Sequence, residues 1–367
     1  AEFQWHRQKT AKAHLMQLPR LSILDQSPIR AGGTAAQALN QTIDLAKRCD
    51  ALGYHRYWVA EHHNTKSFAG SAPEVLIARL AAETKTMRIG SGGVMMPHYA
   101  PLKVAETFRL LETLYPGRID LGLGRAAGAE PRTTAALMPG PKAYPLEVFP
   151  QQVQVLTQFL EDATGLEGDS GGFPDDHPYR GIHAAPMGPG VPDMWLLGSG
   201  GDSAMHAALF GLNYCYAHFI NPESPSRAFE TYRKHFKPSR SLKAPHAAMG
   251  VGVMVADTEE EARRICASRN LWVLWMMQGK PGPFPSIEEA LAYPYTDEER
   301  EILKGIEARG MTGTATQVRN QLLELASDHD VDEFAIVTIT HDHAHRVRSY
   351  ELLADAFALG QAAEATI

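Results

Sequence analysis

The chain has 367 residues, of which 44% are hydrophobic and 21% charged, and its formal net charge is -7 at pH 7. This composition is sufficient for a large buried core and is not that of a disordered chain. A negative chain without a run of lysine and arginine argues against binding to nucleic acid or to an anionic membrane, so a small molecule is the expected partner. Cys49, Cys215 and Cys266 lack the paired spacing of a zinc site or a disulfide scaffold. They fit a reducing compartment, and we expect a cytoplasmic protein.

Residues 1–20 carry several basic side chains but no apolar core of about 7 to 15 residues, so they do not resemble a secretory signal. No stretch of the chain reaches the roughly 18 apolar residues of a membrane span. We therefore predict an N-terminal extension over residues 1–20 and a single domain over residues 21–367.

From Leu21 onward, short apolar stretches alternate with longer segments of helical periodicity. The predicted strands are residues 21–24, 57–60, 88–90, 119–123, 194–197, 214–217, 250–255 and 333–338. The predicted helices are residues 35–52, 73–84, 104–115, 146–160, 203–210, 225–236, 258–270 and 346–359. Eight strand and helix units with short apolar strands predict an α/β fold, the (β/α)8 TIM barrel.

Two long segments interrupt this alternation. Residues 165–192, after the fourth strand, are rich in glycine and proline, and residues 279–313, after the seventh, are predicted to be irregular. Because the alternation resumes after each segment, we interpret them as insertions after strands 4 and 7. The alternative, a doubly wound open sheet, usually has Gly-x-Gly-x-x-Gly after its first strand, where residues 25–28 here are DQSP.

The carboxyl ends of barrel strands meet on one face, where ligands bind. Glu61, His62 and His63 directly follow the second predicted strand, so we expect at least one imidazole to point into the barrel mouth and act as an acid or base. The alternative is that one histidine binds a loop carbonyl while the other is exposed. A metal site is the weaker interpretation, because no second set of histidine and carboxylate ligands lies nearby in sequence.

Residues 91–97 (SGGVMMP) place small and then soft apolar side chains at the end of the third strand, where a flat ring could lie against the backbone. The alternative is that these glycines only fit a crowded barrel rim. Arg125 follows the fourth strand, and residues 198–203 (GSGGDS) lead from the fifth strand into a helix. Free amides at a helix start, together with an arginine, bind phosphate well. Ser203 has the alternative role of an N-cap.

Two further segments are open to more than one interpretation. Residues 341–345 (HDHAH) suggest a metal cluster, but without further carboxylate or cysteine partners nearby we predict a polar loop leading into the last helix. Trp272, Trp275, Met276 and Met277 belong either to the core or to an adaptable wall over the barrel mouth.

These motifs, in this order, resemble those of the bacterial luciferase-like superfamily of flavin-dependent monooxygenases, and in particular its alkanal-monooxygenase-type group. The resemblance rests on residues 21–29 (LSILDQSPI), 57–63 (YWVAEHH) and 91–95 (SGGVM), and it extends through residues 313–315 (GTA) to the last helix. It implies a (β/α)8 barrel, in agreement with the eight strand and helix units.

By this resemblance, His62 lies beside the flavin and takes part in proton transfer, and Arg125 contacts the flavin phosphate. The third strand end carries the isoalloxazine, often with a cis peptide between non-proline residues, which suggests residues 94–96. The other residues implied to hold the cofactor are Gly93, Val94, Met95, Ser199, Gly200, Gly201 and Ser203.

Two departures from the luciferase pattern limit what the resemblance implies. Gly124 stands where luciferases have a reactive cysteine, so light emission is not implied. Ser199 replaces the acidic residue of the phosphate site, so binding there would depend on backbone amides.

The implied function is that of a monooxygenase that uses FMN, reduced by a separate flavin reductase, and O2 to oxygenate a small organic substrate such as an aldehyde. His62 would be its acid or base. The alternatives are a deazaflavin-dependent hydride-transfer oxidoreductase and a non-catalytic flavin-binding protein. The resemblance also implies a homodimer packed through the early helices.

Overall fold

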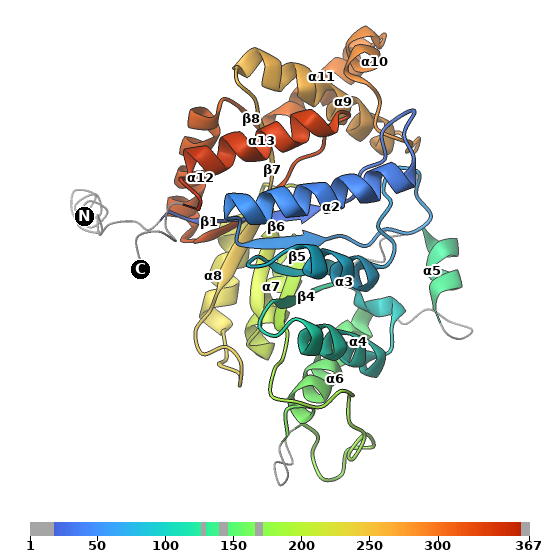
Figure 1. Ribbon diagram of the computed structural model, residues 1–367, viewed down its shortest axis with the longest axis vertical. Coiled ribbons are helices and arrows are strands. Elements are labelled where there is room, and N and C mark those ends of the chain that lie inside the picture. Colours follow the sequence, from blue (N-terminus) through green and yellow to red (C-terminus); the bar gives the residue numbers. More distant parts are fainter. Residues whose placement is uncertain (1–17, 126–129, 139–145, 166–171, 361–367) are drawn as a thin grey trace, which may run out of the picture.

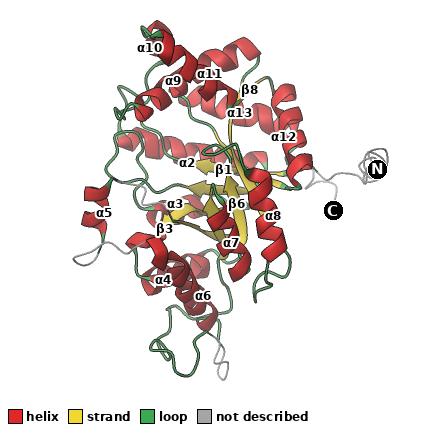
Figure 2. Cartoon of the chain, turned by 180° about the vertical axis from the view of Figure 1, so that it is seen from behind, coloured by secondary structure: helices red, strands yellow, loops and turns green. Residues whose placement is uncertain are grey.

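The computed structural model describes residues 18–125, 130–138, 146–165 and 172–360. Within them, eight parallel strands form a closed barrel in the order β6-β5-β4-β3-β2-β1-β9-β7, with β6 paired to β7 (Figures 1 and 2). The short strand β8 adds to β7. The strands are β1 (Arg20–Asp25), β2 (Arg56–Val59), β3 (Arg88–Met95), β4 (Ile119–Gly124), β5 (Asp193–Gly198), β6 (Asn213–Ala217), β7 (Ala247–Val255), β8 (Met311–Gly313) and β9 (Glu333–Val337). The predicted (β/α)8 TIM barrel is confirmed.

Helices surround the strands, as Figure 2 shows. They are α2 (Ala35–Leu52), α3 (Pro73–Glu83), α4 (Pro101–Leu114), α5 (Pro131–Leu137), α6 (Phe149–Asp162), α7 (Gly201–Phe210), α8 (Pro225–His235), α9 (Glu259–Met277), α10 (Ile287–Ala292), α11 (Asp297–Ala308), α12 (Ala315–His329) and α13 (His343–Ala356), with short 3-10 turns η1 (Met96–His98) and η2 (Leu146–Val148). Every predicted helix is present. The ends agree within three residues, except that α9 continues to Met277, seven residues beyond its predicted end. Strand β1 begins at Arg20, so the last residue of the predicted extension belongs to the barrel.

The prediction of an irregular segment over residues 279–313 is wrong. This segment contains α10, α11 and β8, and α12, which follows it, was not predicted. The signals were capping boxes, in which Thr296 pairs with Glu299 and Thr314 pairs with Gln317. The proline-rich sequence between the short elements hides their periodicity. Figure 1 shows α9, α10 and α11 together at the top of the molecule, beside the barrel.

The insertion after strand 4 agrees with the prediction where the structure describes it. Residues 172–192 contain no helix or strand. Arg109 on α4 holds this loop by donating hydrogen bonds to the carbonyl oxygens of Pro186, Gly188 and Gly190. Among the described residues, no helix has both the length and the apolar character needed to cross a membrane.

The inside of the barrel has an apolar level near the carboxyl ends of the strands and a charged level near their amino ends. The apolar level consists of buried side chains from several strands: Leu24, Trp58, Ala60, Trp195, Cys215, Ala248, Ala335 and Val337. A separate and larger apolar core fills the space between the strands and the helices. The apolar level therefore closes the barrel below the mouth, so ligands must bind above it, in the loops.

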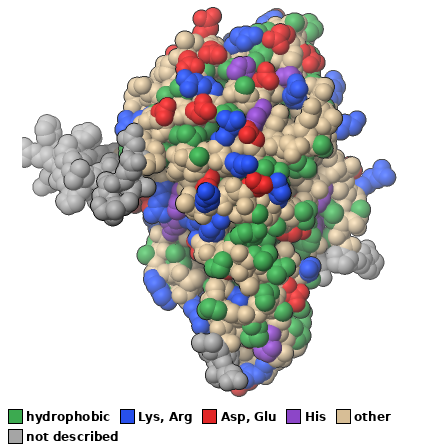
Figure 3. Space-filling view, viewed as in Figure 1, with side chains coloured by type: hydrophobic (Ala, Val, Ile, Leu, Met, Phe, Trp, Pro, Cys, Tyr) green, Lys and Arg blue, Asp and Glu red, His purple; other side chains and the backbone are tan. Residues whose placement is uncertain are grey.

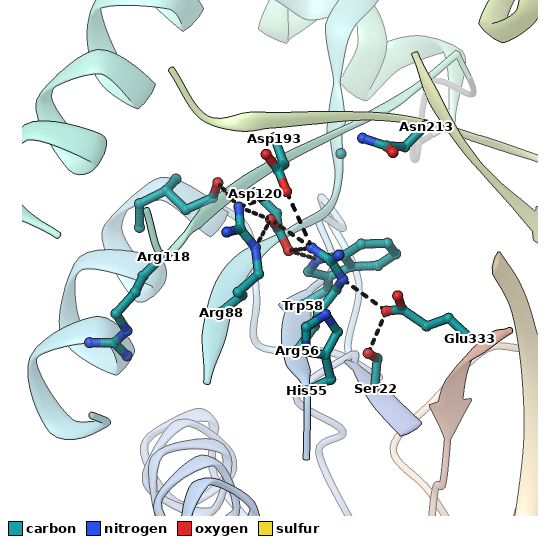
Figure 4. Close-up of polar contacts among 12 residues, drawn as sticks. Ser22, His55, Arg56, Trp58, Arg88, Arg118, Asp120, Asp193, Asn213 and Glu333 are labelled. Carbon is teal, nitrogen blue, oxygen red and sulfur yellow. Dashed lines mark hydrogen bonds and ion pairs between the residues drawn. The ribbon is translucent and has the colours of Figure 1, made fainter. Parts of the chain in front are cut away.

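The charged level is centred on Arg56, which is 4% exposed (Figure 4). Its guanidinium donates to both carboxylate oxygens of Asp120, at 2.9 and 3.0 Å, and to Glu333 Oε1 at 2.8 Å. Arg88 also pairs with Asp120, at 2.7 Å, and with Asp193, at 3.0 Å. These contacts join five of the eight barrel strands, so the network fixes their register at the amino end of the barrel.

We expect Arg56→Met to lower the free energy of unfolding by about 3 to 5 kcal/mol, because it removes the arginine that the buried Glu333 carboxylate binds and leaves the buried Asp120 with Arg88 alone. Urea unfolding measures this change. The control is Arg348→Met, which removes an exposed ion pair with Asp257 and should change stability little. Equal effects of the two substitutions would contradict a structural role for the network.

Candidate active site

A buried carboxylate organises the mouth of the barrel just beyond β2. Glu61 is fully buried. Its Oε1 accepts a hydrogen bond from the Tyr99 hydroxyl, at 2.6 Å, and lies 2.7 Å from His63 Nε2. Its Oε2 accepts the backbone N–H of Met95 at 2.9 Å. Glu61 thus joins the loop after β2 to the end of β3, the segment predicted to lie against a flat ring.

His62 is the neighbour of this carboxylate but does not bind it. Its ring stacks on Phe68, with a centroid distance of 4.4 Å, and its Nδ1 is buried without a hydrogen-bond partner in the described residues. Burial, and to a smaller extent the neighbouring His63, lowers the pKa of His62 to about 4. His62 is therefore a neutral imidazole at physiological pH. Of the two histidines, His63 holds the carboxylate, and His62 has a nitrogen without a protein partner.

Phe68 belongs to an aromatic cluster with Trp272 of α9 and Phe284. The Trp272 and Phe284 rings are stacked at 4.6 Å, and Phe68 meets them at 5.5 and 5.7 Å. The Trp272 indole N–H donates to the Gly282 carbonyl at 2.9 Å, and the ring is 7% exposed. Trp272 is thus core, whereas Met276 and Met277 are 47% and 60% exposed. The insertion after strand 7 thus supports His62 indirectly, because its Phe284 packs against Phe68, on which His62 stacks.

The end of β3 has the irregular backbone that the sequence suggested, but at a different place. The cis peptide bond joins Gly92 and Gly93, not residues within 94–96, and the pairing of β3 with β4 shifts between Gly92 and Val94. A Cβ atom on Gly93 would lie 2.7 Å from the carbonyl oxygen of Gly122, so only glycine fits there. The close approach of β3 and β4 therefore requires glycine at position 93. This agrees with the alternative interpretation, in which the glycines fit a crowded barrel rim.

Arg125 and the start of α7 lie together, as the sequence predicted for a phosphate site. The Arg125 guanidinium donates to Asp202 Oδ2 at 3.0 Å. Helix α7 has no side-chain cap, and side chains on Gly200 and Gly201 would enter open space. The start of α7 is therefore uncapped and has room for a ligand at Gly200 and Gly201, next to a cation, an arrangement that suits an anion.

The remaining residues of this segment play supporting roles. Ser203 is not the N-cap, which is Gly200; its hydroxyl donates to the Gly200 carbonyl at 2.8 Å. The carbonyl of Ser199 accepts a hydrogen bond from the Asn221 side chain at 3.0 Å. These two contacts fix the turn that leads from β5 into α7. Since β4 pairs with β5, this turn and Arg125 are neighbours on the mouth.

The histidines after the last strand are divided between a loop and the start of α13. Residues 341 and 342 complete a loop, and α13 begins at His343, whose Nε2 lies 2.9 Å from Asp44 Oδ2. The predicted polar loop is thus shorter than expected: it ends at Asp342, and residues 343–345 belong to α13. Among the described residues, no group of three or more His, Cys, Asp or Glu side chains is placed to hold a metal ion.

Sequence reasoning missed three members of the site: Glu61, Tyr99 and Asp202. The signal for Glu61 was available, since a carboxylate directly after an apolar strand must find partners if it is buried. The pairing of Asp202 with Arg125 was not readable from the sequence, because it depends on the neighbouring positions of β4 and α7.

A family model described as luciferase-like monooxygenase matches residues 19–355. The chain belongs to the luciferase-like monooxygenase family. An N-acetyl-S-alkylcysteine monooxygenase of Bacillus subtilis (strain 168) is 39% identical over 341 residues, which cover 92% of this chain and 98% of that protein. The crystal structure of apo-MsnO8 is also 39% identical, covers 94% of this chain and 98% of its own, and has a TM-score of 0.83.

Two less similar solved structures share the fold alone. The oxygenating constituent of 3,6-diketocamphane monooxygenase from Pseudomonas putida, in complex with FMN, is 21% identical, with a TM-score of 0.68 and coverage of 93% of this chain and 98% of that one. An F420-dependent secondary alcohol dehydrogenase is 16% identical, with a TM-score of 0.67 and coverage of 93% and 99%. This luciferase-like fold therefore occurs with flavin and with the deazaflavin F420.

We expect His62 to titrate with a pKa of about 4, as measured by NMR of its ring nuclei. Between pH 6.5 and 4 the unfolded chain binds this proton and the folded chain does not, so acidification through this range should lower stability. Phe68→Ala opens the pocket and should raise the pKa of His62 towards 6.5. The control is Phe173→Ala, which removes a similar stacked partner from His177 and should leave His62 unchanged. An unchanged pKa in the Phe68 variant would show that this ring does not cause the burial.

Proposed function

We propose that this family member uses reduced FMN and O2 to oxygenate a small organic substrate, with a separate flavin reductase supplying the reduced cofactor. The observation that carries the proposal is the arrangement of the mouth. A cation and a helix start without a side-chain cap lie at one side, and a buried neutral imidazole, whose Nδ1 has no hydrogen-bond partner among the described residues, lies at the other. A flavin has a phosphate at one end and a reactive ring at the other, so both ends find suitable groups.

The residues present fit the phosphate end of FMN. Arg125 and the amides of Gly201 and Ser203 would bind the phosphate, and Ser199 and Gly200 would shape the turn. The absence of side chains at Gly200 and Gly201 leaves the room that a phosphate needs. Asp202 is the disfavouring element, because its carboxylate already occupies Arg125 and would repel a phosphate. We propose that Arg125 exchanges Asp202 for the phosphate on binding.

The ring end would lie against the backbone of Gly93, Val94 and Met95. Glu61 holds the Met95 amide, so this carboxylate fixes the surface on which the ring would rest. When bound, reduced FMN supplies the activation of O2 and the transfer of one oxygen atom, chemistry that side chains do not perform. The protein's part is to orient the cofactor, exclude water and move protons.

His62 would accept or donate one of those protons. A neutral imidazole has one acceptor nitrogen and one N–H donor, and burial keeps it neutral until a proton is delivered by the reaction. Phe68 fixes the plane of the ring. His63 is less suited to this role, because Glu61 already occupies its Nε2.

The related N-acetyl-S-alkylcysteine monooxygenase makes thioethers reasonable first substrates to test, beside aldehydes and ketones. We also propose a cytoplasmic homodimer. Val75 of α3 and Leu110 and Leu114 of α4 are 68%, 53% and 58% exposed, and Figure 3 shows hydrophobic side chains gathered over this region. An apolar area on the early helices suits packing against a second copy.

The test is anaerobic titration with reduced FMN, followed by mixing with oxygenated buffer that contains candidate substrates. A product carrying one atom of 18O from 18O2 would support the proposal. Binding of FMN without any oxygenated product would favour a flavin-binding protein. Failure to bind FMN, together with binding of the deazaflavin F420, would favour a hydride-transfer enzyme.

We expect Arg125→Gln to weaken FMN binding by about 10- to 100-fold, which corresponds to the loss of a charge-assisted hydrogen bond of roughly 1.5 to 3 kcal/mol. Fluorescence titration measures the dissociation constant. Asp202→Asn is the matched control, since it removes the competing charge at the same contact and should strengthen binding. If both variants bind FMN as the unmodified protein does, the phosphate does not lie at this site.

We expect His62→Gln to lower the turnover rate by about 10²- to 10⁴-fold, the usual contribution of an acid or base, while FMN binding changes little. Steady-state rates and the binding titration together separate the two effects. An equal loss of binding and turnover would indicate that His62 is only a structural residue.

A further inference from the structure

A second polar cavity lies in the insertion after strand 7, away from Arg125 and α7. It has a volume of about 290 Å³ and opens between α9, α11 and β8, at the top of the molecule in Figure 1. One face of α9 lines it, and the end of α11 and strand β8 form the opposite side. The polar side chains that line it include Arg263, Cys266, Arg269, Asn270, Glu307 and Thr312.

Arg269 is the unusual member, because it is a cation without an anion. Its one hydrogen bond to a described residue runs from Nη1 to Asn270 Oδ1, at 3.3 Å. No described carboxylate lies within 4 Å of the Arg269 guanidinium. Arg56 and Arg346, by contrast, each form an ion pair with a buried aspartate. Burial lowers the pKa of Arg269. Most of its five N–H donors have no acceptor in the part of the chain that the structure describes.

The other charges around the cavity do not neutralise Arg269. Arg263, which also lines the cavity, pairs with Glu259 one turn earlier on α9. Glu307 is exposed, and in the described residues it makes no ion pair within 4 Å. Cys266 and Thr312, which also line the cavity, are neutral, and their Sγ and Oγ1 atoms lie 3.4 Å apart. The cavity therefore presents hydrogen-bond donors and an uncompensated positive charge.

We propose that this cavity binds a small oxyanion, a phosphate or carboxylate group, with Arg269 as its main ligand and the Asn270 amide and Thr312 hydroxyl as further donors. A guanidinium offers the paired N–H groups that match such an anion. This site is distinct from the proposed flavin site and does not depend on it. Trp272 lies one turn further along α9 and packs against Phe68, so an anion here would fix the helix that supports His62.

Calorimetric titration with inorganic phosphate tests the proposal. The titration uses the Arg125→Gln variant, so that the proposed flavin-phosphate site does not contribute. Phosphate should bind this variant, and adding Arg269→Gln should weaken binding by at least about tenfold, the effect of losing a charge-assisted contact. Adding Arg264→Gln is the matched control: Arg264 is an arginine of α9 that pairs with Glu288 and does not line the cavity, so this change should alter the affinity little. Arg269→Lys keeps the charge and should retain part of the binding.

A second readout separates binding from a general loss of structure. In sodium chloride, Arg269→Met should melt at a higher temperature than the parent protein, because it removes an unpaired charge. In phosphate of equal ionic strength the order should reverse, since only the parent gains from bound anion. Absence of phosphate binding to the Arg125→Gln protein would overturn the proposal. Equal losses in the Arg269→Gln and Arg264→Gln variants, or no reversal of the melting order, would do the same.

Discussion

The ion network around Arg56 is the constraint on which the rest of the structure depends. A barrel of parallel strands must fill its own interior, and at the amino end of this barrel the filling is charged. Charged side chains are tolerated inside a barrel only when each charge has partners. Arg56 lies between Asp120 and Glu333, and its guanidinium is 4.8 Å from the centre of the Trp195 ring. Because these partners come from different strands, they can all be satisfied only in one register. That register aligns the carboxyl ends on which the site is built.

Two buried carboxylates, Asp25 and Glu61, join separate elements at the carboxyl end of the barrel. Asp25 ends β1 and binds Arg346 of α13 at 2.5 Å, as well as hydroxyl groups of Thr42 and Tyr57. Burial acts to raise the pKa of Asp25, but the charge of Arg346 and these hydrogen bonds outweigh it and hold the pKa below its usual value. Glu61 ends β2 and binds the β3 backbone. One acid therefore joins the first strand to the last helix, and the other joins two loops of the mouth.

The sequence predicted much of the fold, since eight apolar strands and their helices follow from periodicity and from glycine and proline positions. Its main failure, residues 279–313 and α12, arose where elements are short and signalled by caps instead of by an apolar stripe. For the candidate site, the sequence selected the segments that the barrel brings to its mouth: His62, residues 93–95, Arg125 and residues 199–203. It did not foresee that the cis bond lies at Gly92–Gly93 or that Glu61 carries the contacts.

What the sequence determined by itself was which chemical groups stand at which strand ends, because in a parallel barrel the end of every strand reaches the same face. Tertiary structure decided what state those groups are in. His62 is neutral because it is buried against Phe68. Phe68 in turn packs against Trp272 of α9, which lies 210 residues after His62 in the chain. Arg125 is paired and Arg269 is not, because pairing depends on which helix packs beside each guanidinium. Burial and partnership are properties of the packed chain, and local sequence does not contain them.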